Sequence, residues 1–286
     1  MSAEQPQVID LMHLGRERAI GAWRVGDVVV DPGPSSCLPR LLPAIEAAPP
    51  KALALTHIHL DHAGAAGSLA ARFPDLEVWV HERGAPHLVD PSKLLASATR
   101  LYGDDMDRLW GEVLPVPAER LRVLAGGERM GPFEVAYTPG HASHHMAYRH
   151  QPTGWAFTGD VAGVRIDGGP VMAPTPPPDI DLVAWRDSIG VLEAWAPRAL
   201  AVTHFGCHEN VPDHLQALRR HLDEVEQLAE QLDEAEFAAA IAARAARAPE
   251  RDVAPTYGQT MPSSQGYQGL RRYLRLRDEG AERAAI

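Results

Sequence analysis

The sequence predicts a layered α/β protein, and three observations support this. Short apolar runs, turn-forming residues and segments of helical composition alternate along most of the chain. Hydrophobic residues make up 45% and charged residues 23% of the 286 residues, close to the averages of globular proteins. A chain of this length can bury a substantial core, in one large domain or two small ones.

In the N-terminal part, apolar runs bounded by turn residues alternate with helical segments. The predicted strands are residues 8–11, 19–25, 28–31, 51–56 and 77–80, and the predicted helices are 38–47 and 64–73. Residues 86–118 break this pattern, because their apolar side chains recur at helical spacing until Pro115 and Pro117. We therefore predict a helical insertion there.

Strand patterns return after the insertion and are followed by a helical C-terminal region. The predicted strands are 121–124, 133–138, 146–148, 155–158 and 199–203, with a rigid proline-rich loop at 173–178 and a helix at 182–195. Residues 213–247 read as one long amphipathic helix, 249–264 as a loop and 267–277 as a short basic helix. The predicted organisation is one α/β domain over residues 1–212, with residues 213–286 as a helical extension packed on it.

Composition excludes several classes of function. With 27 Lys and Arg against 38 Asp and Glu, the net charge of −11 offers no general attraction for a nucleic-acid backbone. No apolar run is long enough to span a membrane, and the N-terminal residues show no secretory signal. Two cysteines, Cys37 and Cys207, cannot build a disulfide framework. We expect a cytoplasmic protein that acts on a small molecule without nucleic-acid or membrane partners, and a homodimer stays open.

Histidine and aspartate side chains follow several of the predicted strands. The densest cluster is His57-x-His59-x-Asp61-His62, directly after the 51–56 strand. Three more residues of the same types come at later strand ends: His141, Asp160 and His204. Residues i and i+2 of an extended segment point to the same side, so His57 and His59 can converge on one point. Imidazoles and carboxylates suit Zn²⁺, Fe or Mn²⁺.

A single histidine at a strand end is usually a hydrogen-bonded core or surface residue. Three imidazoles and a carboxylate within six residues would repel one another or stay unsatisfied if they were merely buried. The ordered set therefore predicts a metal site.

These motifs, together with Gly140-His141, Gly159-Asp160, Thr203-His204 and the upstream Asp31-Pro32-Gly33, resemble the metallo-β-lactamase-fold hydrolase superfamily, in its glyoxalase-II-like and lactonase-like branch. The resemblance spans roughly residues 8–210. It implies a four-layer αββα sandwich with two divalent metal ions, most simply Zn²⁺, at one edge of the sheets. By the same resemblance, His57, His59 and His141 hold one metal, Asp61, His62 and His204 hold the other, and Asp160 bridges them.

The resemblance also implies a reaction, in which metal-bound hydroxide attacks an electrophilic carbon. Asp61 would orient the water or protonate the leaving group. The all-His/Asp ligand set argues against true β-lactamases, His59 against flavodiiron reductases, and the acidic charge against nucleases. A thioester or lactone remains the expected substrate, although lactonase relatives carry a tyrosine where this chain has Gly163. A mononuclear-iron persulfide dioxygenase and a phosphodiesterase stay open as alternatives.

Residues around the predicted ligands receive supporting roles. Asp31 is either a hydrogen-bond acceptor for a ligand imidazole or a turn former, and His144 and His145 are predicted to support ligands rather than bind metal. We predict that Cys207 is not a ligand. The segments 86–118, 173–178 and 257–273 are expected to wall a partly apolar pocket above the metals, with Tyr102 as a candidate substrate contact. His81, His208 and His214 are predicted to be structural or surface residues.

Overall fold

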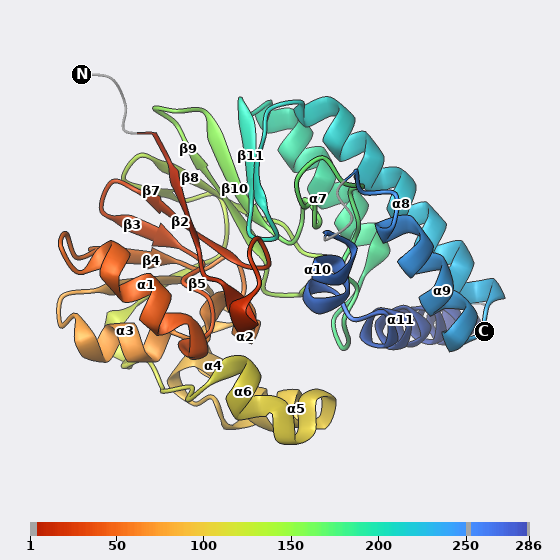
Figure 1. The fold of residues 1–286 in the computed structure, drawn as a ribbon, viewed down its shortest axis with the longest axis horizontal. Coiled ribbons are helices and arrows are strands. Elements are labelled where there is room, and N and C mark those ends of the chain that lie inside the picture. The colour runs from red at the N-terminus through yellow and green to blue at the C-terminus, as the bar shows by residue number, and fades with distance from the viewer. Residues whose placement is uncertain (1–4, 250–252, 285–286) are drawn as a thin grey trace.

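A computed structural model describes residues 5–249 and 253–284. Within these ranges the strands form two six-stranded sheets that pack face to face, with helices on both outer faces (Figure 1). The predicted αββα sandwich is confirmed. Among the helices of the described ranges, none combines the length and apolarity needed to cross a bilayer.

The first sheet has the order β1-β2-β3-β4-β5-β6, antiparallel from β1 to β3 and parallel from β3 to β6. Its strands are β1 (Gln7–Asp10), β2 (Gly21–Val25), β3 (Val28–Val30), β4 (Ala52–Ala54), β5 (Glu77–His81) and β6 (Leu121–Leu124). Side chains alternate between its faces. Val28 and Val30 enter the core between the sheets, whereas Val29 packs against the outer helices. Those helices are α1 (Leu38–Ile45), α2 (Leu60–Ala63) and α3 (Ala66–Arg72).

The second sheet has the order β12-β11-β10-β9-β8-β7, and only its β10–β11 pair is parallel within the described chain. Its strands are β7 (Arg129–Met130), β8 (Phe133–Tyr137), β9 (Met146–His150), β10 (Trp155–Gly159), β11 (Ala199–Val202) and β12 (Gly206–His208). The outer face carries α7 (Leu182–Trp195), α8 (Val211–Gln231), α9 (Glu234–Ala245), α10 (Val253–Thr260) and α11 (Ser263–Ala284). One apolar cluster joins side chains of this sheet to those helices.

The predicted helical insertion is confirmed between β5 and β6. It consists of α4 (Ala85–Val89), α5 (Ser92–Tyr102) and α6 (Met106–Trp110). Figure 1 shows α5 and α6 outside the two sheets, on the side of the molecule where α2 and α10 also lie. Leu60 of α2 packs with Ala98 and Trp110 of the insertion in a small apolar cluster. The insertion therefore covers the end of the sandwich at which α2 begins.

Two predictions for the C-terminal region are wrong. The single helix expected over 213–247 is two helices, because the chain is extended at Leu232 and Asp233 and Asp233 then caps α9 in a capping box with Glu236. The loop expected over 249–264 contains α10 and the start of α11, which continues well beyond the predicted 267–277. Tertiary contacts stabilise α10, since the Tyr257 hydroxyl donates to Pro170 O at 2.6 Å and accepts from Ile166 N at 3.1 Å.

Candidate metal centre

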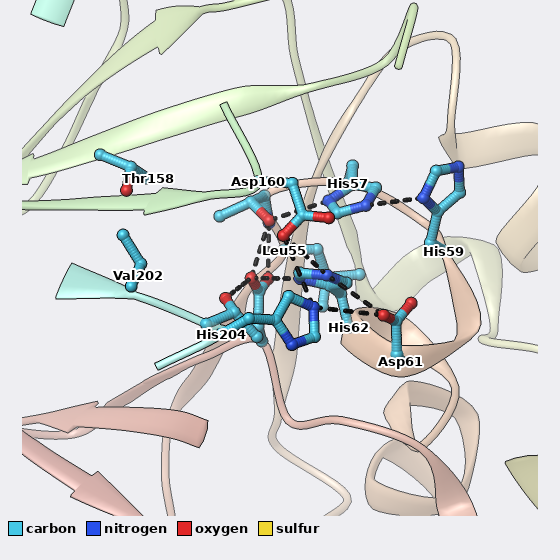
Figure 2. A network of polar contacts seen from close by, with 12 residues as sticks. Leu55, His57, His59, Asp61, His62, Thr158, Asp160, Val202 and His204 are labelled. Atoms are coloured by element: carbon cyan, nitrogen blue, oxygen red, sulfur yellow. Dashed lines mark hydrogen bonds and ion pairs between the residues drawn. The ribbon is translucent and has the colours of Figure 1, made fainter. Parts of the chain in front are cut away.

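The seven predicted ligands come together at one edge of the sandwich, where strands of both sheets end. All of them except His141 are labelled in Figure 2. His57 and His59 lie in the loop after β4, and Asp61 and His62 lie in α2. His141, Asp160 and His204 follow β8, β10 and β11 in the second sheet. Gly159 is required before Asp160, because its φ is +45° and a Cβ there would lie 2.3 Å from Thr56 Oγ1.

Three overlapping groups of side chains within the described residues have the spacing of metal ligands: His57, His59 and His141; His57, His62 and Asp160; and Asp61, His62 and His204. The first and the last of these coincide with the two predicted sites and are called the first and the second group. In the first group, His59 Nδ1 lies 2.9 Å from His57 Nε2 and 3.1 Å from His141 Nε2. In the second group, Asp61 Oδ2 lies 3.3 Å from His204 Nε2 and 3.7 Å from His62 Nε2. Tetrahedral ligands at about 2.0–2.1 Å from a metal are about 3.3–3.4 Å apart, and the observed separations bracket that value.

Asp160 lies between the two groups and divides its oxygens between them. Its Oδ2 lies 3.3 Å from His141 Nε2 of the first group. Its Oδ1 lies 3.4 Å from His62 Nε2 and 3.6 Å from His204 Nε2 of the second group. A carboxylate placed in this way can contribute one oxygen to each of two neighbouring cations.

The hydrogen bonds on the far side of the imidazoles fit metal binding. His141 Nδ1 donates to Pro174 O at 2.9 Å, His204 Nδ1 to Ala19 O at 2.7 Å and His62 Nδ1 to Asp31 Oδ2 at 2.8 Å. These acceptors carry no proton, so each bond keeps a proton on Nδ1 and makes Nε2 the nitrogen that faces the site.

Unpartnered buried atoms support the same interpretation. His62 Nε2, His204 Nε2 and Asp160 Oδ1 are buried and have no hydrogen-bond partner within the described residues. Such atoms are costly unless something else satisfies them, and these three point at the same small region. The donor set of imidazoles and carboxylates, without a thiolate, therefore fits divalent cations such as Zn²⁺, Fe²⁺ or Mn²⁺.

The two groups differ in their electrostatics. Burial holds the pKa of His57 well below its ordinary value and lowers that of His59 to about 4, so both imidazoles are neutral. Burial also acts on His62 and His204, but Asp160 and Asp61 outweigh it and raise the pKa of both. Asp160 keeps a pKa well below the ordinary value, because the surrounding histidines outweigh the effect of its burial. The second group thus has a negative field that suits a cation.

Asp31 connects the two groups through hydrogen bonds on the side of the imidazoles that faces away from the predicted metals. Its buried carboxylate accepts hydrogen bonds from Thr56 N at 2.8 Å, Thr56 Oγ1 at 2.7 Å, Thr203 Oγ1 at 2.9 Å and His62 Nδ1. The Thr56 hydroxyl in turn accepts from His57 Nδ1 at 3.1 Å. Of the two roles considered for Asp31, the acceptor role is confirmed, and its φ of +49° gives it a left-handed backbone conformation.

The other predicted supporting residues lie around the centre. His145 Nε2 accepts from Asp160 N at 3.3 Å and its Nδ1 donates to Thr138 Oγ1 at 2.9 Å, so it orients the segment that carries Asp160. His144 Nδ1 accepts from Ile58 N at 3.4 Å. Cys207 is exposed, burial of part of its side chain raises the thiol pKa to about 11, and no potential ligand group of the described chain includes it. His81 stacks on Tyr137, whereas His214 donates to Ala162 O and packs beside His208, as expected of structural residues.

Comparison with known proteins identifies the family. The model of the metallo-beta-lactamase superfamily matches residues 26–208, which contain all seven predicted ligands. The chain belongs to this superfamily. Among solved structures, the superfamily protein ST1585 from Sulfolobus tokodaii superposes with a TM-score of 0.71 at 21% identity, over 94% of this chain and 98% of that one. The protein TTHA1623, solved in a di-iron-bound form, superposes with a TM-score of 0.55 at 26% identity, over 70% and 93% of the two chains.

Curated sequences of the superfamily match over shorter stretches. ST1585 of Sulfurisphaera tokodaii is 30% identical over 161 residues, which are 54% of this chain and 60% of that protein. The probable metallo-hydrolase YqgX of Bacillus subtilis is 33% identical over 114 residues, 39% and 49% of the two chains. A hydroxyacylglutathione hydrolase of Salmonella typhi is 31% identical over 137 residues, 46% and 41%. The chain thus spans between two and three fifths of the length of these relatives, and they support a metal-dependent, hydrolase-like enzyme.

A cavity of about 470 Å³ opens onto the candidate metal centre, and Asp61, Asp160 and His204 form part of its wall. The insertion, the proline-rich loop and the C-terminal region provide its other walls, as predicted for the segments 86–118, 173–178 and 257–273. Its volume lies within the range of about 300–1,000 Å³ that is usual for small-molecule sites.

His13 is a residue of this cavity that the sequence analysis missed. Its buried imidazole stacks on Trp110 at 5.5 Å between ring centroids, and its Nε2 donates to Leu109 O at 2.9 Å. Its Nδ1 accepts from Gln259 at 3.2 Å. His13 thus ties the insertion to α10. No pattern marks it, because it lies in a short turn between two left-handed residues, Met12 and Leu14.

Proposed function

We propose that the protein is a binuclear metal-dependent hydrolase that cleaves a small ester-like substrate, a thioester or a lactone. In this proposal His57, His59 and His141 hold one metal ion and Asp61, His62 and His204 hold the other. Asp160 bridges them. The observation that carries the proposal is the position of Asp160, whose two oxygens face the two ligand groups at the wall of a cavity large enough for a small molecule.

Divalent ions bound at this centre would lower the pKa of water and polarise the substrate carbonyl. The protein's own residues prepare the site for this chemistry. Asp31 and the carbonyl groups of Ala19 and Pro174 fix the ligand tautomers. Asp61 has a side chain that is 21% exposed and faces the cavity, so it can accept a hydrogen bond from the attacking water and orient it. Water adds its oxygen to the acyl carbon, the carbon–sulfur or carbon–oxygen bond breaks, and the leaving group takes the proton.

Acyl hydrolysis is supported by the relatives named hydroxyacylglutathione hydrolase, since that name describes acyl hydrolysis. The tyrosine of lactonase relatives has no counterpart at Gly163, where a Cβ would lie 2.7 Å from Met172 O. Tyr102 instead lines the cavity from the insertion.

The test combines metal analysis with a substrate panel. The purified protein is analysed for bound metals, stripped with a chelator, reloaded and assayed with thioesters, lactones and phosphodiesters. We expect about two Zn²⁺-type ions per chain and hydrolysis of a thioester or lactone that chelation abolishes and metal restores. An Asp187→Ala variant, which changes an exposed carboxylate on α7, is the control and keeps both properties. A single iron with persulfide oxidation would instead identify a dioxygenase, and phosphodiester cleavage alone would refute the acyl specificity.

A further inference from the structure

The cavity extends well beyond the metal centre. Its wall includes Val225 of α8 and Phe237 and Ile241 of α9, all from helices of the C-terminal region. These side chains are nearly buried, with Phe237 only 1% exposed and Ile241 7%. They belong to the apolar cluster on the outer face of the second sheet, far along the chain from the ligand loops. The cavity thus leads from polar ligands at one end to a deep apolar wall at the other.

The part of the wall that the insertion provides is apolar as well. The insertion contributes Leu94 and Leu101 from α5 and Leu109 and Trp110 from α6. Trp110 is held in place between the stacked ring of His13 and the edge of Tyr102, whose ring centroid is 5.0 Å away. These ring contacts therefore hold the Trp110 side chain in place in the cavity wall.

Some polar side chains of the cavity wall already have hydrogen-bond partners. The Tyr102 hydroxyl donates to Gln265 Oε1 at 3.3 Å, and the Thr175 hydroxyl donates to Gly266 O at 3.1 Å. Gln259 donates to His13 O at 3.0 Å and accepts from Arg16 Nε at 3.0 Å. A polar substrate group against these residues would lose its hydrogen bonds to water and find these partners occupied. Charged side chains, Arg83 and Lys93, also line the cavity.

From this geometry we infer that the substrate carries an aliphatic acyl chain, which runs from the metal centre toward Phe237 and Ile241. The inference rests on the proposed function and specifies its substrate class. The carbonyl group lies at the ligand end, where the chemistry takes place, and the hydrocarbon lies against the apolar walls. Phe237 and Ile241 then set the length of chain that the cavity accepts.

The test measures chain-length dependence in two independent ways. Metal-loaded protein is assayed with acyl thioesters from acetyl to dodecanoyl, and binding of the matching n-alkanoates is measured by calorimetry. We expect kcat/KM and affinity to rise about fourfold per added methylene until the cavity is full, since burial of one CH₂ group contributes a roughly constant free energy. A flat profile in the wild-type protein, with the short thioester hydrolysed, overturns the acyl-chain inference while the proposed function stands.

Two variants change the far end of the cavity in opposite directions. Phe237→Ala enlarges it and is expected to shift the optimum to longer chains, whereas Ile241→Phe fills it and shifts the optimum to shorter ones. Val183→Ala, at an exposed position of α7, is the control with an unchanged profile. If Phe237→Ala fails to fold, Ile241→Phe alone decides, because general damage lowers all rates and does not move the optimum.

The outcomes separate this inference from the proposed function. Chain-length-dependent binding of alkanoates without hydrolysis of any thioester or lactone supports the cavity assignment and refutes the hydrolase proposal. Hydrolysis with optima that stay unchanged in both variants refutes the role of Phe237 and Ile241.

Discussion

Replacement of Asp31 by asparagine tests how the carboxylate behind the metal centre acts. Asp31 Oδ2 accepts three hydrogen bonds, from Thr56 Oγ1, His62 Nδ1 and Thr203 Oγ1, and Oδ1 accepts one from Thr56 N. Asparagine has the same shape but only one acceptor oxygen. If that oxygen takes the Oδ2 position, the amide NH₂ faces the backbone N–H of Thr56, and two donors meet without an acceptor.

The magnitude follows from these bonds. Loss of the bond from Thr56 N to a charged acceptor costs about 1.5–3 kcal/mol, and the three remaining bonds weaken because their acceptor becomes neutral. We expect the metal-free protein to lose about 3–5 kcal/mol of its free energy of unfolding. Metal affinity should fall about 10–100-fold, because outer partners of this kind orient the ligand and raise its basicity. The site that includes His62 should weaken more than the site that includes His57, which reaches Asp31 only through the Thr56 hydroxyl.

The assay titrates metal-free protein with Zn²⁺ in competition with a fluorescent chelator, alongside denaturant unfolding. Asp10→Asn is the matched control, because Asp10 accepts bonds from Met12 N and Arg18 N and contacts no predicted ligand. It should lose stability and keep its metal affinity. If Asp31→Asn also loses only stability, the carboxylate acts on the fold alone and the reasoning about ligand orientation is wrong.

Three further predictions concern the centre and its surroundings. Asp160→Ala should lower metal content and turnover together, by about 100-fold or more in turnover, and retention of two metals with normal activity would contradict a bridging role. Cys207→Ser should leave metal content and turnover unchanged, as measured by elemental analysis and the substrate assay, because the exposed thiol lies outside the ligand groups. Burial lowers the pKa of His214 from 6.5 to about 3, so between these pH values the unfolded chain binds a proton that the folded chain excludes. The contribution of His214 to the free energy of unfolding is therefore complete above pH 6.5. It is lost on acidification at about 1.4 kcal/mol per pH unit. In denaturant titrations at several pH values, the free energy of unfolding of His214→Gln should decline less steeply on acidification than that of the wild-type protein.

The clustering of the candidate metal ligands was predictable from the sequence because the densest part of the cluster is local. Four of the seven polar side chains lie within six residues directly after an apolar strand, so a single loop brings them together. The remaining ligands each follow a strand of the other sheet, and strand ends meet at one edge of a layered fold. Asp31 was recognisable only as one of two alternatives, because its acceptor role depends on the imidazole of His62, which lies 31 positions away.

The C-terminal region was harder to predict, for a different physical reason. In the sequence, apolar residues at helical spacing continue from α8 into α9 without a visible break. The chain changes direction between the two helices because Asp233 forms a capping box with Glu236. The segment 249–264 contains Gly, Pro, Ser and Thr and has weak helical propensity. It forms α10 nevertheless, because Tyr257 and Val253 are buried in the apolar cluster between the second sheet and its outer helices. The Tyr257 hydroxyl also donates a hydrogen bond to Pro170 O. Those partners are distant in sequence and leave no periodic signal.

The proline-rich loop explains why the C-terminal helices matter for the metal centre as well as for the cavity. Pro174 O accepts from Nδ1 of His141, a predicted metal ligand, so the position of this loop sets the orientation of that imidazole. The preceding residue, Ala173, donates its N–H to the buried ring of His221 in α8 at 2.9 Å. The following residue, Thr175, donates to Gly266 O in α11, where a side chain on Gly269 would lie 2.0 Å from Thr175 O. The loop is thus held from two helices of the C-terminal region while it holds the imidazole of His141. The helical region that lines the apolar part of the cavity therefore also helps to orient a predicted metal ligand. If the proposed function holds, the same helices act on substrate binding and on the metal centre.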